Sequence, residues 1–255
     1  MPASYAHYRF GRLLLPGLPA EVRPCVQRFR RMYDTGLQGP DFFFYYSPGF
    51  HTATFALGDS FHKQSGREFF STACAAATSE AARAYLLGLL GHYCLDSVIH
   101  PFVDRLDAAG EAAHVPLESE FERYLLLKDK EPSPHTYDAG KFLKLTRGEA
   151  LTVATFYPGV TGWAVSHSVR SMALFLRLLA HPNRKLQKQI LAATYPKLLD
   201  FRIPEESSDA LAPYVTELSD LYHQALERYP ALLQEITAHL QTGKPLTEAF
   251  APDFG

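Results

Sequence analysis

Residues 86–104 read LLGLLGHYCLDSVIHPFVD, a run apolar enough for the interior of a helical protein. His92, Asp96 and His100 interrupt it at intervals of four residues. Side chains at positions i, i+4 and i+8 of a helix lie on one face, within a stripe about 80° wide. Burying such groups without partners is costly. The run therefore predicts a core helix that presents three polar side chains in one direction.

Helical spacing of apolar residues extends along most of the chain, whereas the alternation typical of strands is hard to find. Ser79 and Glu80 favour the start of the central helix, and Pro101 should end it soon after His100. The aromatic-rich residues 36–66 are expected to form a loop, as are residues 128–140. We expect helices near residues 21–35, 66–78, 79–103, 116–128, 140–145, 161–179, 184–198, 210–228 and 229–241.

All 255 residues are predicted to form a single all-α domain, a multi-helix bundle. No internal repeat or flexible linker divides the sequence. The candidate metal ligands fall in residues 1–125, and residues 140–255 have the pattern of a helical scaffold.

Composition narrows the classes of function. The formal net charge of −2 gives no general attraction to nucleic acid or to anionic membranes, so stable nucleic-acid binding is not expected. The three cysteines form no C-x-x-C pair, which favours buried thiols in a reducing compartment. The run LLLPGLP is broken by proline and has no cleavage site behind it, so no signal peptide is predicted. No segment approaches the roughly 20 apolar residues of a bilayer span. We therefore expect a soluble, cytoplasmic protein.

His92 and Asp96 have the spacing at which two side chains of one helix bind a metal ion. His100 lies a further turn along and could reach a second ion, with the two oxygens of Asp96 available to bridge both. The simpler alternative is that each histidine is a satisfied core residue or a charge at a helix end. Two histidines and an aspartate in register on an apolar face favour the metal site.

A second pair of ligand type, His114 and Glu118, follows downstream. Pro116 lies between them, and because proline favours the first turn of a helix, His114 could fall just outside it. The other polar side chains of this stretch are expected on a solvated face: Glu120, Glu122 and Arg123.

Further candidate ligands lie upstream, at His7, Asp41, His51, Asp59 and His62. Asp41 precedes the aromatic run 42–46 and would lie at the edge of an apolar wall, although a lone aspartate after proline is more often a turn residue or helix cap. At least half of the five aromatic side chains should pack in the core, and the others could line a cleft.

The ordered series His7, PDFFFYY, GDSFHK, GHYCLDSVIHP and HVPLE resembles the zinc-dependent phospholipase C family and, more distantly, the S1/P1-type nucleases. The resemblance covers about the first half of the chain. In that family three zinc ions share an all-helical active site. The resemblance implies one zinc held by Asp41, His62, His92 and Asp96, a second by His100, His114 and Glu118, and a third by His7 and the other oxygen of Asp96.

The resemblance also implies hydrolysis of phospholipids or related phosphodiesters by metal-activated water, with Asp41 orienting the water or taking its proton. Transient contact with a membrane surface is the expected consequence of such a substrate. Secreted members use an N-terminal tryptophan as a zinc ligand, whereas this sequence opens MPASYAH and its one tryptophan is Trp163. We therefore expect two or three zinc ions. The short interval from Asp96 to His100 is similar to the intracellular branch of the family.

Two other functions stay open. An S1/P1-like nuclease would need a basic groove and a base-stacking pocket, which the net charge does not favour. A metal-stabilised, non-catalytic binding or scaffold protein would keep the ligands without activity. Histidine and carboxylate ligands suit zinc but also accept manganese or iron.

Overall fold

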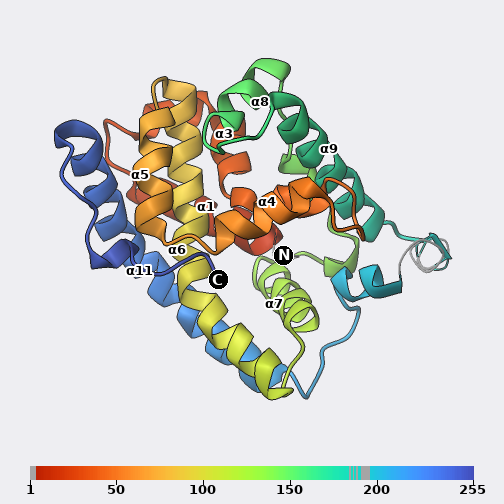
Figure 1. The fold of residues 1–255 in the computed structure, drawn as a ribbon. Helices are drawn as coiled ribbons and strands as arrows, with labels where there is room; N and C mark the ends of the chain where they lie inside the picture. Colours follow the sequence, from red (N-terminus) through yellow and green to blue (C-terminus); the bar gives the residue numbers. More distant parts are fainter. Residues whose placement is uncertain (1–3, 184, 186, 188, 191–195) are drawn as a thin grey trace.

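The computed structural model of the protein describes residues 4–183, 185, 187, 189, 190 and 196–255, and every regular element within these ranges is helical (Figure 1). The predicted all-α bundle is confirmed. The α-helices are α1 (Ser4–Leu14), α2 (Arg23–Arg28), α3 (Arg30–Gly36), α4 (Ala53–His62), α5 (Gly66–Ala76), α6 (Glu80–Ala109), α7 (His114–Lys128), α8 (Arg147–Ala154), α9 (Gly162–Leu179) and α11 (Ala212–Thr242). The 3₁₀ helices are η1 (Leu15–Gly17), η2 (Gly39–Tyr45), η3 (Pro134–Thr136), η4 (Ala139–Phe142), η5 (Pro196–Phe201) and η6 (Glu248–Phe250).

Helix α6 is the central element, and α3 and α11 pack along it (Figure 1). The Ser79 hydroxyl caps it by accepting a hydrogen bond from the Ala82 N–H, and Gly110 ends it in the left-handed conformation (φ 70°). By length and mean hydropathy (1.3) α6 could cross a membrane, contrary to our expectation that no segment would qualify. However, 83% of that window is buried inside the protein, as in a core helix.

Two glycines allow α3 and α6 to cross at backbone contact. A Cβ atom on Gly88 would lie 2.1 Å from the Tyr33 carbonyl oxygen, and one on Gly36 would lie 2.3 Å from that of Tyr85. Larger side chains would therefore push the helices apart. The close crossing brings η2, which follows α3 in the chain, against the middle of α6.

The prediction that Pro101 ends the central helix is wrong, because α6 continues to Ala109. Likewise, Pro230 lies inside α11, which is one helix where we expected two, 210–228 and 229–241. An internal proline costs about 3 kcal/mol. Buried side chains flank both prolines, including His100 and Val103 in α6, and this packing on either side offsets the lost hydrogen bond.

Other elements also differ from the sequence-based expectations. Helices α1, α4 and α8 were not predicted, and residues 36–66 contain η2 and α4 instead of a plain loop. The expected helix 21–35 is divided into α2 and α3 at Phe29, and 140–145 overlaps only the short η4. The expected helix 184–198 lies largely outside the described residues. Of the aromatic run, Phe42, Phe43 and Tyr45 are buried, which confirms core packing for three of the five.

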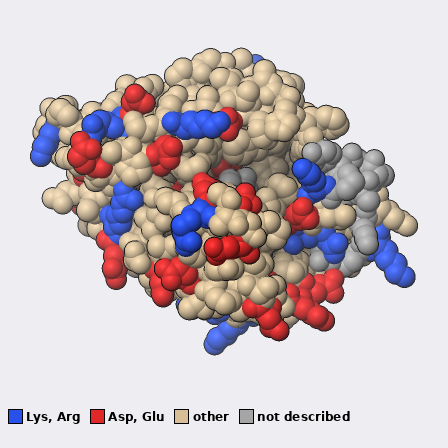
Figure 2. Space-filling model, turned by 60° about the horizontal axis from the view of Figure 1, so that its bottom comes forward, with Lys and Arg blue, Asp and Glu red and all other residues tan. Residues whose placement is uncertain are grey.

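Surface charge on the face shown in Figure 2 is mixed in sign. Acidic and basic side chains are interspersed over it, and acidic side chains gather near its centre beside a hollow.

Candidate metal centre

The polar stripe of α6 lies in the interior, as the spacing predicts. His92, Asp96 and His100 are all buried, and they point toward side chains from α1, η2 and α7. Helical periodicity alone aligns the three α6 residues, whereas their partners come from tertiary packing.

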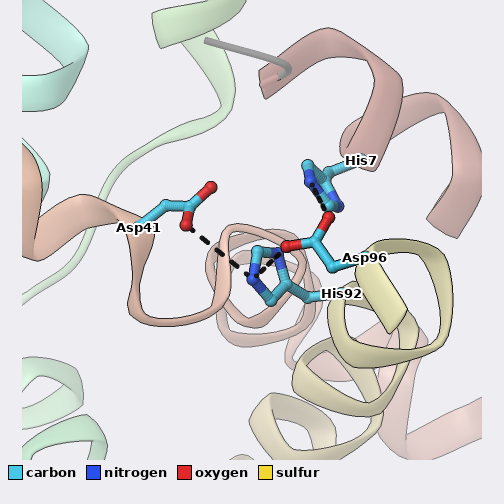
Figure 3. A group of neighbouring side chains, drawn as sticks. All are labelled: His7, Asp41, His92 and Asp96. Carbon is cyan, nitrogen blue, oxygen red and sulfur yellow. Dashed lines mark ion pairs between the residues drawn. The ribbon is translucent and has the colours of Figure 1, made fainter. Parts of the chain in front are cut away.

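The first group of potential ligands is His7 from α1, Asp41 from η2, and His92 and Asp96 from α6 (Figure 3). One ligand atom from each lies within 4.8 Å of the others. Asp96 Oδ1 is 3.1 Å from His7 Nε2, and Asp96 Oδ2 is 3.0 Å from His92 Nε2. Asp41 Oδ1 lies 3.9 Å from the same His92 nitrogen. These four side chains could hold one metal ion.

The second group comprises His100, His114 and Glu118, whose ligand atoms also lie within 4.8 Å of one another. Glu118 Oε1 is 3.6 Å from His100 Nε2 and 3.3 Å from His114 Nε2. Pro116 occupies the first turn of α7, so His114 lies inside the helix, at its first residue. Asp96 Oδ1 is 3.9 Å from His100 Nε2, which places Asp96 between the two groups.

Three ligand histidines have an oxygen acceptor behind the ring. His92 Nδ1 lies 3.2 Å from the Leu37 carbonyl oxygen, and His100 Nδ1 lies 2.7 Å from that of Phe254. His114 Nδ1 lies 3.1 Å from Asp104 Oδ1. Such acceptors hold the ring proton on Nδ1 and leave the Nε2 lone pair facing the other ligands, which is the usual support of a metal-binding histidine.

Several polar atoms of the two groups lack hydrogen bonds. Five are buried without a partner: His7 Nδ1, His92 Nε2, Asp96 Oδ2, His114 Nε2 and Glu118 Oε2. Buried polar atoms are normally satisfied, so such a cluster needs an explanation. Lone pairs of nitrogen and oxygen about 3 Å apart repel unless a cation lies between them. The donor set therefore fits a metal ion in each group.

The electrostatics of the centre favour cations. Asp41, Asp96 and Glu118 are buried, and in the described part of the chain only histidines lie within ion-pair distance of them. Burial alone raises a carboxyl pKa, yet the neighbouring imidazoles hold the pKa of Asp96 below its usual range. The pKa of Asp41 is also lowered, and His92 and His62 contribute to that shift. Burial raises the pKa of Glu118 too, but the neighbouring His100 and His114 outweigh it and lower that pKa to about 2. Three ionised carboxylates thus lie in a buried space, and no lysine or arginine among the described residues pairs with them.

The histidines respond to the same field in two ways. Burial lowers the pKa of His92 to about 4, which leaves it neutral and able to coordinate. Burial also opposes protonation of His100, but Asp96 and Glu118 outweigh it and raise the pKa to about 10. In the metal-free centre a proton on His100 therefore supplies part of the missing positive charge.

His62, expected as a ligand beside Asp41, lies behind it. Its Nε2 is 2.7 Å from Asp41 Oδ1, and its Nδ1 is 2.8 Å from the Gly58 carbonyl. The ring is buried and stacks on Phe44. His62 thus contacts the first group through Asp41.

Two acidic residues near the centre were not anticipated. Asp104 lies one turn beyond His100, on the same face of α6 as His92 and Asp96. It was not predicted because the helix was expected to end near Pro101. Glu122 was expected on a solvated face, but it is buried, and so is Glu120. The Glu122 carboxylate accepts hydrogen bonds from the backbone N–H groups of Tyr5 and Ala6 (3.2 Å for Ala6), and thereby fixes the start of α1 next to His7.

The remaining candidates lie apart from both groups. His51 packs edge-on against Phe55, and Asp59 pairs with Lys63 at 2.7 Å. Of the three cysteines expected to be buried, Cys74 and Cys94 are buried and Cys25 is half-buried, and none belongs to either ligand group.

No protein-family model, no curated protein and no solved structure matches this chain.

Proposed function

We propose that this chain is a metal-dependent phosphodiester hydrolase with a two-metal centre, resembling the zinc-dependent phospholipases C. The observation that carries the proposal is the position of Asp96. One of its oxygens faces His92 at 3.0 Å, while the other lies 3.1 Å from His7 and 3.9 Å from His100. A carboxylate between two ligand groups is the arrangement by which hydrolases hold paired cations.

Zinc is the ion that we propose for both groups, since imidazole and carboxylate are among its usual ligands. His7, Asp41, His92 and Asp96 would hold one ion, and His100, His114 and Glu118 would hold the other. When bound, zinc lowers the pKa of a coordinated water toward about 7 and neutralises phosphodiester charge. A third ion, by analogy with the family, would require further ligands near His7.

Asp41 is the residue we propose to orient the attacking water or to take its proton. Its carboxylate is ionised, and the His62 ring lies 2.7 Å from Oδ1. The backbone at Gly58 holds the opposite side of that ring, so the aspartate is fixed in direction. A rigid base of this kind places the proton acceptor before the substrate binds.

Phospholipids are the phosphodiesters that the motif series favours. Exposed aromatic side chains support transient contact with a membrane surface: Phe50 is 67% exposed and Trp163 66%. Aromatic rings with this exposure suit the membrane–water interface. A cytoplasmic location remains part of the proposal.

The two alternative functions, a nuclease and a non-catalytic metal-stabilised protein, differ in how well the structure supports them. The mixed charge in Figure 2 offers no continuous basic track on that face, so a nuclease is the weaker choice. A metal-stabilised, non-catalytic protein has better support, because almost all of the ligands are buried. The His114 side chain is the most exposed of the ligands, at 23%, although its Nε2 is buried.

The test is hydrolysis by protein purified without chelator. The substrates are phospholipid vesicles, single-stranded DNA and a chromogenic phosphodiester. We expect release of a phosphorylated head group, loss of that activity with chelator and recovery with zinc. His114→Ala should abolish turnover, whereas His51→Ala, a histidine outside both groups, should not. Protein that carries two metals per chain and turns over none of the three substrates would support the non-catalytic alternative.

A further inference from the structure

The segment that follows η6, residues 251–255, reaches the metal centre from the other end of the chain (Figure 1). Two hydrogen bonds to the Pro252 carbonyl anchor it, from the Gly66 N–H at 2.8 Å and from the Tyr93 hydroxyl at 3.1 Å. Arg228 of α11 donates to the Ala249 carbonyl just before it, at 2.6 Å. The segment is therefore fastened to α5, α6 and α11 where it passes the ligands.

The backbone of Phe254 contacts two of the histidines. Its N–H donates to the His62 carbonyl at 3.0 Å, and its own carbonyl accepts from His100 Nδ1 at 2.7 Å. The second bond decides which nitrogen of His100 carries the proton. It leaves Nε2 free toward Glu118 and Asp96, as coordination requires.

The Phe254 ring forms a wall behind the same ligands. It is fully buried, and its centroid lies 6.0 Å from that of His62 and 5.9 Å from that of His92. It also packs edge-on against Phe69 and Tyr93. The Phe254 ring thus packs beside both imidazoles, and it limits the rotation of His92, whose Nδ1 alone is hydrogen-bonded.

Gly255 lies directly against the His100 imidazole. Its φ of +96° is a conformation that other residues rarely adopt, and a Cβ atom there would come within 2.2 Å of His100 Nδ1. Any side chain at this position would displace either the imidazole or the segment.

We propose that residues 252–255 are a positioning segment of the metal centre. They fix the Nδ1 proton and ring orientation of His100 and support the rings of His62 and His92, so metal affinity depends on them. The inference rests on the metal centre of the proposed function, but not on hydrolysis. It assigns a role to residues that lie more than a hundred positions after the last ligand.

Phe254→Leu and Phe250→Leu form a matched pair for the test. Both phenylalanines are 0% exposed, and both pack against Phe70 and Tyr93. They differ in that the Phe254 ring also contacts the rings of His62 and His92. Zinc affinity would be measured by competition with a chromophoric chelator, and ligand geometry by the visible spectrum of the cobalt-loaded full-length protein. Thermal melting of the metal-free variants shows that they fold.

We expect Phe254→Leu and Gly255→Ala to weaken zinc binding about 10- to 100-fold and to change the cobalt spectrum. Phe250→Leu should melt at a similarly reduced temperature and keep both wild-type properties. Equal losses of affinity in the two leucine variants would overturn the proposal, because the effect would then be general destabilisation. Unchanged affinity in both Phe254→Leu and Gly255→Ala would also overturn it. Neither readout needs turnover, so a protein that binds zinc but hydrolyses nothing contradicts the proposed function and leaves this test intact.

Discussion

His92 and Asp96 face each other with Nε2 and Oδ2 3.0 Å apart, and neither atom has a hydrogen-bond partner. The Leu37 carbonyl accepts from His92 Nδ1, so the facing nitrogen carries a lone pair. Two acceptors at this distance repel each other in a buried space. A bound cation removes the repulsion and neutralises Asp96, and the stability of the fold should therefore depend on metal.

Removal of metal should lower the melting temperature by about 10 °C. A ligand present at about 1,000 times its dissociation constant stabilises a protein by about 4 kcal/mol, and each kcal/mol shifts melting by about 2–4 °C in a chain of this size. Calorimetry with and without chelator measures the shift, and added zinc should reverse it. A melting temperature indifferent to chelator and zinc would contradict the account.

The pH dependence of the metal-free protein should follow His100. Burial opposes its protonation, but Asp96 and Glu118 raise its pKa from 6.5 to about 10. Between these values the folded state binds more protons than the unfolded state. The stabilisation is therefore complete below pH 6.5 and is lost as the pH rises toward 10. Denaturant unfolding of the metal-free protein near pH 6 and pH 9 should show this fall.

Zinc affinity should change in the opposite direction, because the ion must displace the His100 proton. It should rise by up to about tenfold per pH unit across the same window. His100→Gln is the control, since it should flatten the stability decline. An equally steep decline in that variant would assign the effect to another group.

Glu122 should stabilise the start of α1. Burial raises its pKa to about 8, so at neutral pH it is mostly protonated in the metal-free protein, and Glu122→Gln imitates it closely. Glu122→Ala removes the acceptor of the Tyr5 and Ala6 N–H groups and should cost about 2–4 kcal/mol. Urea unfolding of the metal-free Glu122→Gln and Glu122→Ala proteins measures the free energy of unfolding of each variant. Equal stabilities of the alanine and glutamine variants would show that these hydrogen bonds contribute nothing.

Gly39→Ala should weaken zinc binding in the first group. Gly39 has a φ of +49°, and a Cβ atom there would lie 2.1 Å from His92 Cδ2. Gly110→Ala is the matched control, because its φ of +70° imposes similar strain with no atom within 4 Å. Both variants should lose stability, but only Gly39→Ala should lose zinc affinity in chelator competition. Equal zinc affinities in the two variants would mean that Gly39 is needed only for its backbone conformation and not for the position of His92.

The residues that sequence reasoning located correctly have local signatures. His92, Asp96 and His100 share a face through helical periodicity, and His114 and Glu118 do so on α7. Asp104 lies four residues after His100, but it was not predicted because Pro101 was expected to end the helix before it. Proline preferences describe an isolated helix, and here burial on both sides of Pro101 outweighs them.

The supporting shell has no comparable signature. The carbonyls of Leu37 and Phe254 hold two imidazoles, and any residue type offers a carbonyl. Glu122 resembled a surface acid because its partners are backbone N–H groups of a helix more than a hundred residues away. Such contacts follow from how the helices pack, which spacing along the chain does not reveal.

Metal content per chain tests the central claim most directly, that Asp96 lies between two cations. Elemental analysis of wild type, Asp96→Asn and the surface control Asp59→Asn would use protein purified without chelator, with helicity checked by circular dichroism. The account predicts about two zinc ions in wild type and in Asp59→Asn, and fewer than one in folded Asp96→Asn. Fewer than one metal ion in wild type, or two retained in Asp96→Asn, would contradict it.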